Sequence, residues 1–221
     1  MSEQQTNELI RELSAELAPV RPIPPMRVVL VSVIGLWLLV AVVGLAILGR
    51  NPGLLDELLN WRGIGAVFFG LGVAGVSGLV AAIGLSIPGR ENVVRAGLAA
   101  ALAGMALSAG VGTALLMRSP VAAVPAPWTS DLTCLGIACA VALLPALGIV
   151  WFAGRAAPFR PLTVTLAAAA ATTALGAMVA QAHCPFLDMR HLLVAHVFAP
   201  GVGALVLSVP LLIALRRVGR G

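Results

Sequence analysis

Six long apolar stretches constrain the fold of this chain more than any other feature. They lie behind a polar tail and are separated by short segments that carry most of the charged residues. They cover approximately residues 28–48, 63–87, 96–117, 132–153, 162–182 and 192–215. A helix needs about 20 largely apolar residues to cross a bilayer, and each stretch reaches that length. The sequence therefore predicts an all-α polytopic membrane protein with six transmembrane helices.

The composition supports this class. Hydrophobic residues make up 60% of the 221 residues and charged residues only 10%, whereas a soluble domain usually carries about 25% charged residues. Little of the chain is left for a separate soluble domain. We expect a short cytoplasmic tail, residues 1–26, and a six-helix transmembrane domain, residues 27–221. Because the first ten residues are acidic and polar, we expect no cleaved signal peptide.

The positions of the basic residues predict the orientation in the membrane. All fourteen are arginine. With the N-terminus in the cytoplasm, ten of them face inward, namely Arg11, Arg21, Arg27, Arg90, Arg95, Arg155, Arg160, Arg216, Arg217 and Arg220. Four face outward, namely Arg50, Arg62, Arg118 and Arg190. The positive-inside rule favours this arrangement, so we expect both termini in the cytoplasm. No basic run resembles a nucleic-acid-binding patch, and the lipid bilayer is the expected partner of this surface.

The tail contains one amphipathic segment. Leu9, Ile10, Leu13 and Leu17 recur at helical spacing over residues 7–17, with charged residues on the other side. So short a helix is marginal alone in water, which indicates a partner surface for its apolar face. Four prolines over residues 19–27 then predict an extended strut that leads into the first span.

Three prolines and one loop carry further structural information. Pro145, Pro200 and Pro210 lie inside predicted spans and should kink their helices. The loop after the first span reads GLLDELLNW over residues 53–61, and its leucine-rich face predicts a short helix at the membrane interface.

The patterns that would support catalysis or ion-coupled transport are missing. No Asp, Glu or Lys lies deep inside a predicted span, whereas ion-coupled transporters usually place such groups near the midplane. Nor does the chain contain a Ser-His-Asp or HExxH pattern typical of a hydrolase. We expect no enzyme and no catalytic residues.

Cysteine and histidine form the best candidate site. Cys134 opens the fourth span and Cys184 closes the fifth, so both fall at the outer mouth of the bundle. His183 adjoins Cys184, and His191 opens the sixth span. The two cysteines can form a disulfide, act as a reversible redox pair, bind a soft metal with histidine help, or simply pack as small buried residues.

Two neighbouring residues are interpreted as packing residues. Cys139 lies five residues after Cys134, which turns it far around the helix. His196 lies one to two turns deeper than the start of the sixth span, where a hydrogen-bonded core histidine is more common than a ligand.

Three segments resemble the NrsF-like family of bacterial anti-sigma factors. They are LSAELAPVRPIPP (13–25), TCLGIACAVALLPAL (133–147) and HCPFLDMRHLLVAH (183–196). The resemblance extends over essentially the whole chain. The sequence departs from the family at Phe186, where an acidic residue often follows His-Cys-Pro.

The resemblance implies a function. Such proteins hold an extracytoplasmic-function sigma factor at the bacterial inner membrane and release it under periplasmic oxidative or heavy-metal stress. The family cysteines correspond to Cys134 and Cys184. From their positions we expect His183 or His191 to act as auxiliary ligands if this pair binds a soft metal. The apolar face of the tail is then the sigma-binding segment. The alternative is a small six-span transporter or channel of unknown substrate.

Overall fold

The computed structural model describes residues 3–15, 23–59, 63–118, 126–156, 158–186 and 188–219, and these ranges contain helices and no strand. The all-α prediction is therefore confirmed. The elements are α1 (Glu3–Ala15), α2 (Met26–Leu48), α3 (Leu54–Leu59), α4 (Ile64–Gly84), α5 (Glu91–Arg118), α6 (Trp128–Ala156), α7 (Pro161–His183), α8 (Met189–His191), the π-helix η1 (Leu192–Phe198) and α9 (Ala199–Val218).

Six of these helical segments are long and apolar enough to cross a membrane. They are α2, α4, α5, α6, α7 and the continuous run formed by α8, η1 and α9. Several extend beyond the apolar stretches: α5 begins at Glu91 and α6 at Trp128. A helix continues into the charged interfacial region because its backbone hydrogen bonds do not depend on side-chain polarity, whereas an apolar stretch ends at the first charge. The six-span prediction is confirmed.

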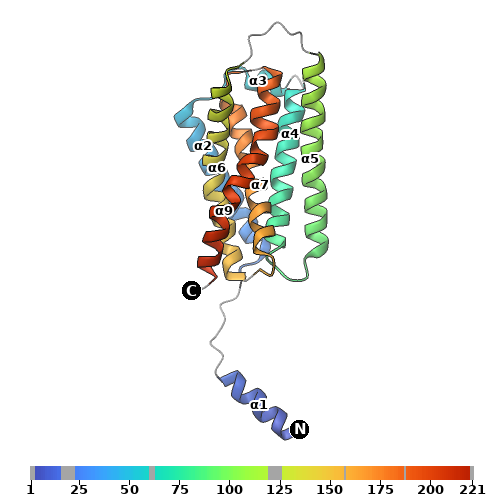
Figure 1. Cartoon of the computed structure of the whole chain (residues 1–221), viewed down its shortest axis with the longest axis vertical. Coiled ribbons are helices and arrows are strands. Elements are labelled where there is room, and N and C mark those ends of the chain that lie inside the picture. Colours follow the sequence, from blue (N-terminus) through green and yellow to red (C-terminus); the bar gives the residue numbers. More distant parts are fainter. Residues whose placement is uncertain are drawn as a thin grey trace.

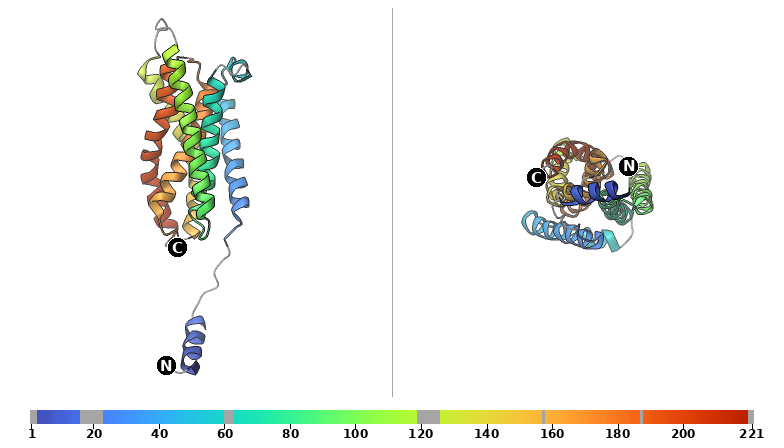
Figure 2. Two further views of the ribbon diagram at one scale, coloured as in Figure 1. Left: turned by 90° about the vertical axis from the view of Figure 1, so that its right-hand side faces the viewer. Right: turned by 90° about the horizontal axis from the view of Figure 1, so that it is seen from below.

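Helix α7 lies at the centre of the bundle. It packs against α4, α6 and α9, and also contacts α2. Its many alanines let neighbouring helices approach closely. Helix α5 packs mainly against α4 and lies at the periphery, where most of its surface faces outward (Figures 1 and 2). The contact between α4 and α5 needs glycine, because a Cβ added to Gly104 would lie 2.5 Å from the carbonyl oxygen of Gly70.

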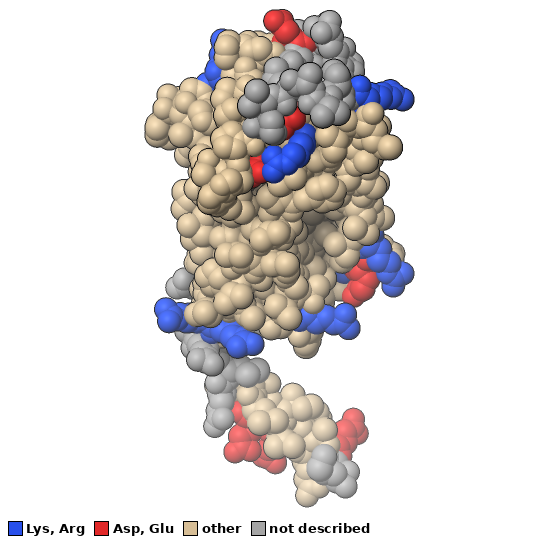
Figure 3. Space-filling model, turned by 45° about the horizontal axis from the view of Figure 1, so that its top comes forward, with Lys and Arg blue, Asp and Glu red and all other residues tan. Residues whose placement is uncertain are grey.

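The two ends of the bundle differ. Helix α1 stands apart from the bundle beyond the end where the C-terminus lies, whereas the short α3 lies across the opposite end (Figures 1 and 2). A short helix in the first loop was predicted, and α3 confirms it. Figure 3 shows charged side chains near both ends of the bundle, with a largely uncharged wall between them on the visible face. This distribution is that of a protein surrounded by lipid.

The prolines affect their helices in two ways. Helices α6 and α9 continue through Pro145 and Pro210. Before Pro200 the backbone instead forms η1, and the N–H of Ala199 donates to the carbonyl of Val194, five residues earlier. Proline has no N–H, so the carbonyl four residues before it loses its α-helical partner, and a π-turn accommodates the disruption.

Candidate functional site

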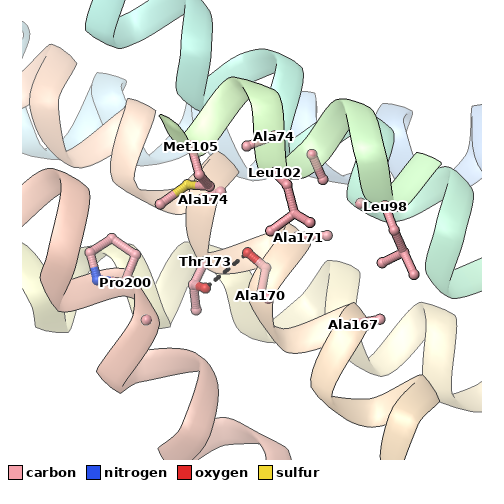
Figure 4. Close-up of a pocket in the computed structure, with 13 residues that line it drawn as sticks. Ala74, Leu98, Leu102, Met105, Ala167, Ala170, Ala171, Thr173, Ala174 and Pro200 are labelled. Carbon is pink, nitrogen blue, oxygen red and sulfur yellow. Dashed lines mark hydrogen bonds between the residues drawn. The ribbon is translucent and has the colours of Figure 1, made fainter. Parts of the chain in front are cut away.

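An apolar groove in the middle of the bundle offers space but no reactive group. It has a volume of about 220 Å³ and is bounded by α4, α5, α7 and the start of α9 (Figure 4). Thr173 contributes a hydroxyl, which donates to the carbonyl of Ala170 at 3.1 Å. None of the residues that line the groove is titratable. The chemistry of this chain therefore lies elsewhere.

Four buried side chains meet near the end of the bundle that carries α3. Their ligand atoms, the sulfurs of Cys134 and Cys184 and one ring nitrogen each of His191 and His196, all lie within 4.8 Å of one another. All four side chains are at most 5% exposed. They come from α6, the segment after α7, α8 and η1. We call these four residues the Cys/His cluster.

His191 is the centre of the cluster. Its Nε2 lies 3.2 Å from Sγ of Cys184 and 3.6 Å from Sγ of Cys134. Its Nδ1 donates to Oδ1 of Asp131 at 2.5 Å. A carboxylate can only accept, so this bond fixes the proton of the neutral ring on Nδ1 and leaves the Nε2 lone pair directed at the two sulfurs.

Asp131 and His191 are fixed in turn by residues that close the cluster from outside. The other carboxylate oxygen of Asp131 lies 3.5 Å from Nη2 of Arg190, and Nη1 of Arg190 donates to the carbonyl of Ala126 at 3.3 Å. Asp188 caps α8 by accepting from the backbone N–H of His191 at 3.2 Å. The imidazole is therefore held from two directions, by its ring and by its backbone.

Cys184 is anchored through its backbone. Its carbonyl accepts from the side-chain amide of Asn51 at 3.0 Å, and its N–H donates to the carbonyl of Ala180 in the last turn of α7. A hydrogen bond from the Cys134 thiol holds the pKa of the Cys184 thiol below its usual value, against the opposing effect of burial. A thiol whose pKa is lowered is readily available as a thiolate, the form that binds metals and reacts with oxidants.

The structure brings together three of the four residues predicted for the site. Cys134, Cys184 and His191 form the core of the cluster. His183 lies apart from it, because its Nδ1 donates to the carbonyl of Gly49 at 2.8 Å. Cys139 also lies outside the cluster, against Gly203 of α9. All three cysteines are free thiols.

Two members of the site were not predicted. Asp131 immediately precedes the fourth apolar stretch, and its spacing of three residues from Cys134 is the signal that could have placed both on one helix face. His196 was interpreted as a packing residue. In an α-helix a residue five positions from His191 points about 140° away. In η1 the backbone bonds join residues five apart, which brings both imidazoles to the same side.

The tail contains a helix, as predicted, but it begins at Glu3, four residues before the predicted start at residue 7. Helix α1 covers residues 3–15, and its Leu9, Ile10 and Leu13 are exposed. Leu17 and most of the proline-rich strut lie outside the described residues.

The donor set of the cluster suits a metal. Two cysteine thiolates and two neutral imidazoles are common ligands of Zn²⁺ and of softer cations. The four residues therefore have the composition and proximity of a metal-binding site, as well as two thiols close enough to take part in redox chemistry.

The comparisons with known proteins identify the family. The model of a family described as "Negative regulator of sigma F" matches residues 13–218, nearly the whole chain. No curated protein and no solved structure matches the chain. The family description names a regulator of a sigma factor, which favours this class over the transporter or channel. The six apolar helices and the extent of the match show that the chain is a membrane protein that belongs to the negative regulator of sigma F family.

Proposed function

We propose that this protein is a membrane-bound anti-sigma factor that binds an extracytoplasmic-function sigma factor through its N-terminal segment. The observation that carries the proposal is the exposed apolar face of α1, formed by Leu9, Ile10 and Leu13, on a helix that stands apart from the bundle (Figure 1). A 13-residue helix gains little stability from its own hydrogen bonds in water. An apolar groove on a partner would both order the helix and bury this face.

The proposal divides the chain into two parts with different tasks. Residues 1–26 bind the sigma factor, and residues 27–221 anchor the tail and respond to the signal. Both termini then lie in the cytoplasm of a bacterium, and the bundle lies in the inner membrane. Reporter fusions test this topology: a fusion at residue 221 should give a cytoplasmic signal, and an insertion near residue 124 a periplasmic one. A periplasmic C-terminus would contradict the model.

We further propose that the signal is an oxidant or a soft metal acting on Cys134 and Cys184, with His191 as an auxiliary ligand. To change the bound fraction of sigma factor from nearly complete to nearly zero, the signal must favour the released state by about 5 kcal/mol. The free energy of forming or breaking a disulfide or a thiolate–metal bond is large enough to supply this difference. Packed helices tend to switch between discrete arrangements, so a change in bonding at Cys134 and Cys184 can alter the helix packing and thereby affect the tail.

Copurification tests the binding step directly. The tagged full-length protein, extracted from membranes, should carry a sigma factor that mass spectrometry identifies. A variant that lacks residues 2–18 should reach the membrane in equal amount but carry none. Equal capture by both proteins would show that the tail is not the binding segment.

A further inference from the structure

We propose that Cys134, Cys184, His191 and His196 form a four-coordinate binding site for one Zn²⁺ ion or a softer divalent cation of similar coordination preference. The binding site itself does not depend on the proposed function, but its role in releasing a sigma factor rests on that function. The two cysteines thereby become part of a complete set of four ligands, and Asp131 is the hydrogen-bond partner that orients one of them, His191.

His196 provides the first independent argument for a ligand. The side chain is 1% exposed, and among the described residues neither ring nitrogen has a hydrogen-bond partner. A buried polar group that is left unpaired costs about 1–3 kcal/mol, so a native protein seldom keeps one without a reason. The ring of His196 packs edge-on against that of His191, with the centroids 5.2 Å apart. A cation between the imidazoles and the thiols would give His196 its missing partner.

His191 provides the second argument, because its environment is that of a metal ligand. Histidines that bind metals usually donate their other ring N–H to a carboxylate, which fixes the tautomer and makes the ligating nitrogen more basic. Asp131 is that carboxylate, at 2.5 Å from Nδ1. The free Nε2 faces both sulfurs. The first coordination shell and its outer partner are thus already arranged in the protein.

The spacing of the four ligand atoms fits a closed tetrahedral site. Zinc–sulfur and zinc–nitrogen bonds of about 2.3 and 2.0–2.1 Å place neighbouring ligand atoms about 3.3–3.8 Å apart. The four atoms here lie within 4.8 Å of one another, so the widest pair must approach by about 1 Å. Four protein ligands leave no open position for a substrate. A closed site of this kind is typical of structural or sensing metals rather than catalytic ones.

The π-helix is what completes the ligand set. With regular α-helical geometry His196 would point about 140° away from His191, and only three ligands would remain. The turn forced by Pro200 brings His196 to the cluster. A cation bound there would link the start of α6, the end of α7 and the start of the sixth span. An external two-electron oxidant that joins the sulfurs of Cys134 and Cys184 in a disulfide would break both metal–sulfur bonds and expel the cation. Either this oxidation or replacement by a cation that prefers other geometry would release the link at the place where the proposed function needs a switch.

Metal binding by the purified full-length protein tests this proposal without any sigma factor. The reduced protein in detergent is stripped with a chelator and titrated with Zn²⁺, and then with Co²⁺ as an optical probe. We expect one ion per chain, and for Co²⁺ the intense visible bands of tetrahedral coordination together with thiolate charge-transfer absorption. His196→Ala should weaken binding at least tenfold and shift the visible bands, because water would take the fourth position, and Asp131→Asn should weaken binding about 10- to 100-fold without shifting them.

Matched variants serve as controls. Cys139→Ser removes a thiol on the same helix, and His183→Ala removes an imidazole next to Cys184, but neither residue belongs to the cluster. Both should bind Zn²⁺ as the unchanged protein does. If His196→Ala unfolds, as judged by gel filtration and thermal unfolding, His196→Gln provides the second variant. A stoichiometry well below one, octahedral Co²⁺, or unchanged affinity in every folded His196 variant would overturn the proposal.

The Zn²⁺-binding test and the copurification test can fail independently. Capture of a sigma factor by a protein that binds no Zn²⁺ would contradict the metal site alone. Tight tetrahedral binding by a protein that captures no sigma factor would contradict the proposed function alone.

Discussion

The two ends of this molecule are organised in opposite ways. At the end that carries α3, polar side chains from several elements are buried and bonded to one another around His191. At the other end, α1 presents exposed leucine and isoleucine side chains and stands apart from the bundle (Figure 1). One end is organised before any ligand arrives, whereas the other presents an exposed apolar face on a helix that stands apart from the bundle.

The difference indicates how the two ends can divide the work of a regulator. A site organised in advance loses little conformational entropy when it binds a ligand, so a small ligand can bind there tightly. A short separate helix must be ordered by its partner, and its affinity is therefore sensitive to small changes. Variants at each end, and in the bundle between them, test whether the two ends have these separate roles.

The largest effect is expected at the tail. Leu13→Asp places a carboxylate on the apolar face, and burying it unpaired in the sigma interface costs of order 2–4 kcal/mol. Affinity should fall about 30- to 700-fold, and the sigma-dependent genes should be expressed without any stress. A transcriptional reporter and copurification measure the two effects. Arg11→Ala makes the same change in net charge on the other side of α1 and should leave repression intact. Full repression by a stably expressed Leu13→Asp protein would exclude this helix as the binding segment.

The second largest effect is expected at Cys134 and Cys184, on the response to metal and oxidant. Cys134→Ser and Cys184→Ser should each prevent the normal response to metal and oxidant, and the double variant should behave as the single variants do. Residues that act as a unit are not additive, which is why the double variant decides whether they form a pair. Cys139→Ser should respond almost normally, because Cys139 lies against α9 outside the cluster. Normal induction in the double variant would place the sensor elsewhere.

Most of the fold could be predicted from the sequence, for a simple physical reason. A helix that faces lipid must be apolar over its whole length, so length and composition alone locate it. The six spans follow from this rule to within a few residues at each end. The exact ends could not be predicted, because Glu91 and Trp128 are compatible with both a helix and an interfacial loop.

The site could be predicted only in part. Cys134 and Cys184 follow from topology, since six alternating spans place both at the same end. His196 was interpreted as a packing residue, because it joins the cluster only through the π-turn before Pro200. The proline predicts a kink, but sequence periodicity does not report a turn whose backbone bonds join residues five apart. Asp131 was missed because it lies just outside an apolar stretch. Its role is visible only once its carboxylate is seen at His191.

A smaller effect is expected in the bundle that separates the two ends. A methyl group on Gly104 would lie 2.5 Å from the carbonyl oxygen of Gly70 and 2.7 Å from the backbone nitrogen of Ala74. Backbone atoms cannot move aside cheaply, so Gly104→Ala should destabilise the packing of α4 on α5 by about 1–3 kcal/mol. Thermal unfolding in detergent measures this. Gly110→Ala lies on the same helix with nothing within 4 Å and provides the matched control. Equal stability of the two variants would show that this helix contact is looser than the structure indicates.

The smallest effect is expected for Asp188→Ala, which should distinguish most clearly between the binding role of the tail and the sensing role of the cluster. Asp188→Ala removes the cap of α8, whose carboxylate accepts from the backbone N–H of His191 at 3.2 Å. Loss of a capping side chain typically costs about 0.5–2 kcal/mol, too little to unfold the bundle but enough to loosen the position of His191. We therefore expect unchanged repression without stress, because α1 is untouched, together with a severalfold change in the metal concentration needed for induction. Asp56→Ala on α3 removes a carboxylate near the same end but away from the cluster, and should change neither property. If Asp188→Ala instead weakens repression without stress and leaves the metal threshold unchanged, the two ends do not divide the work in this way.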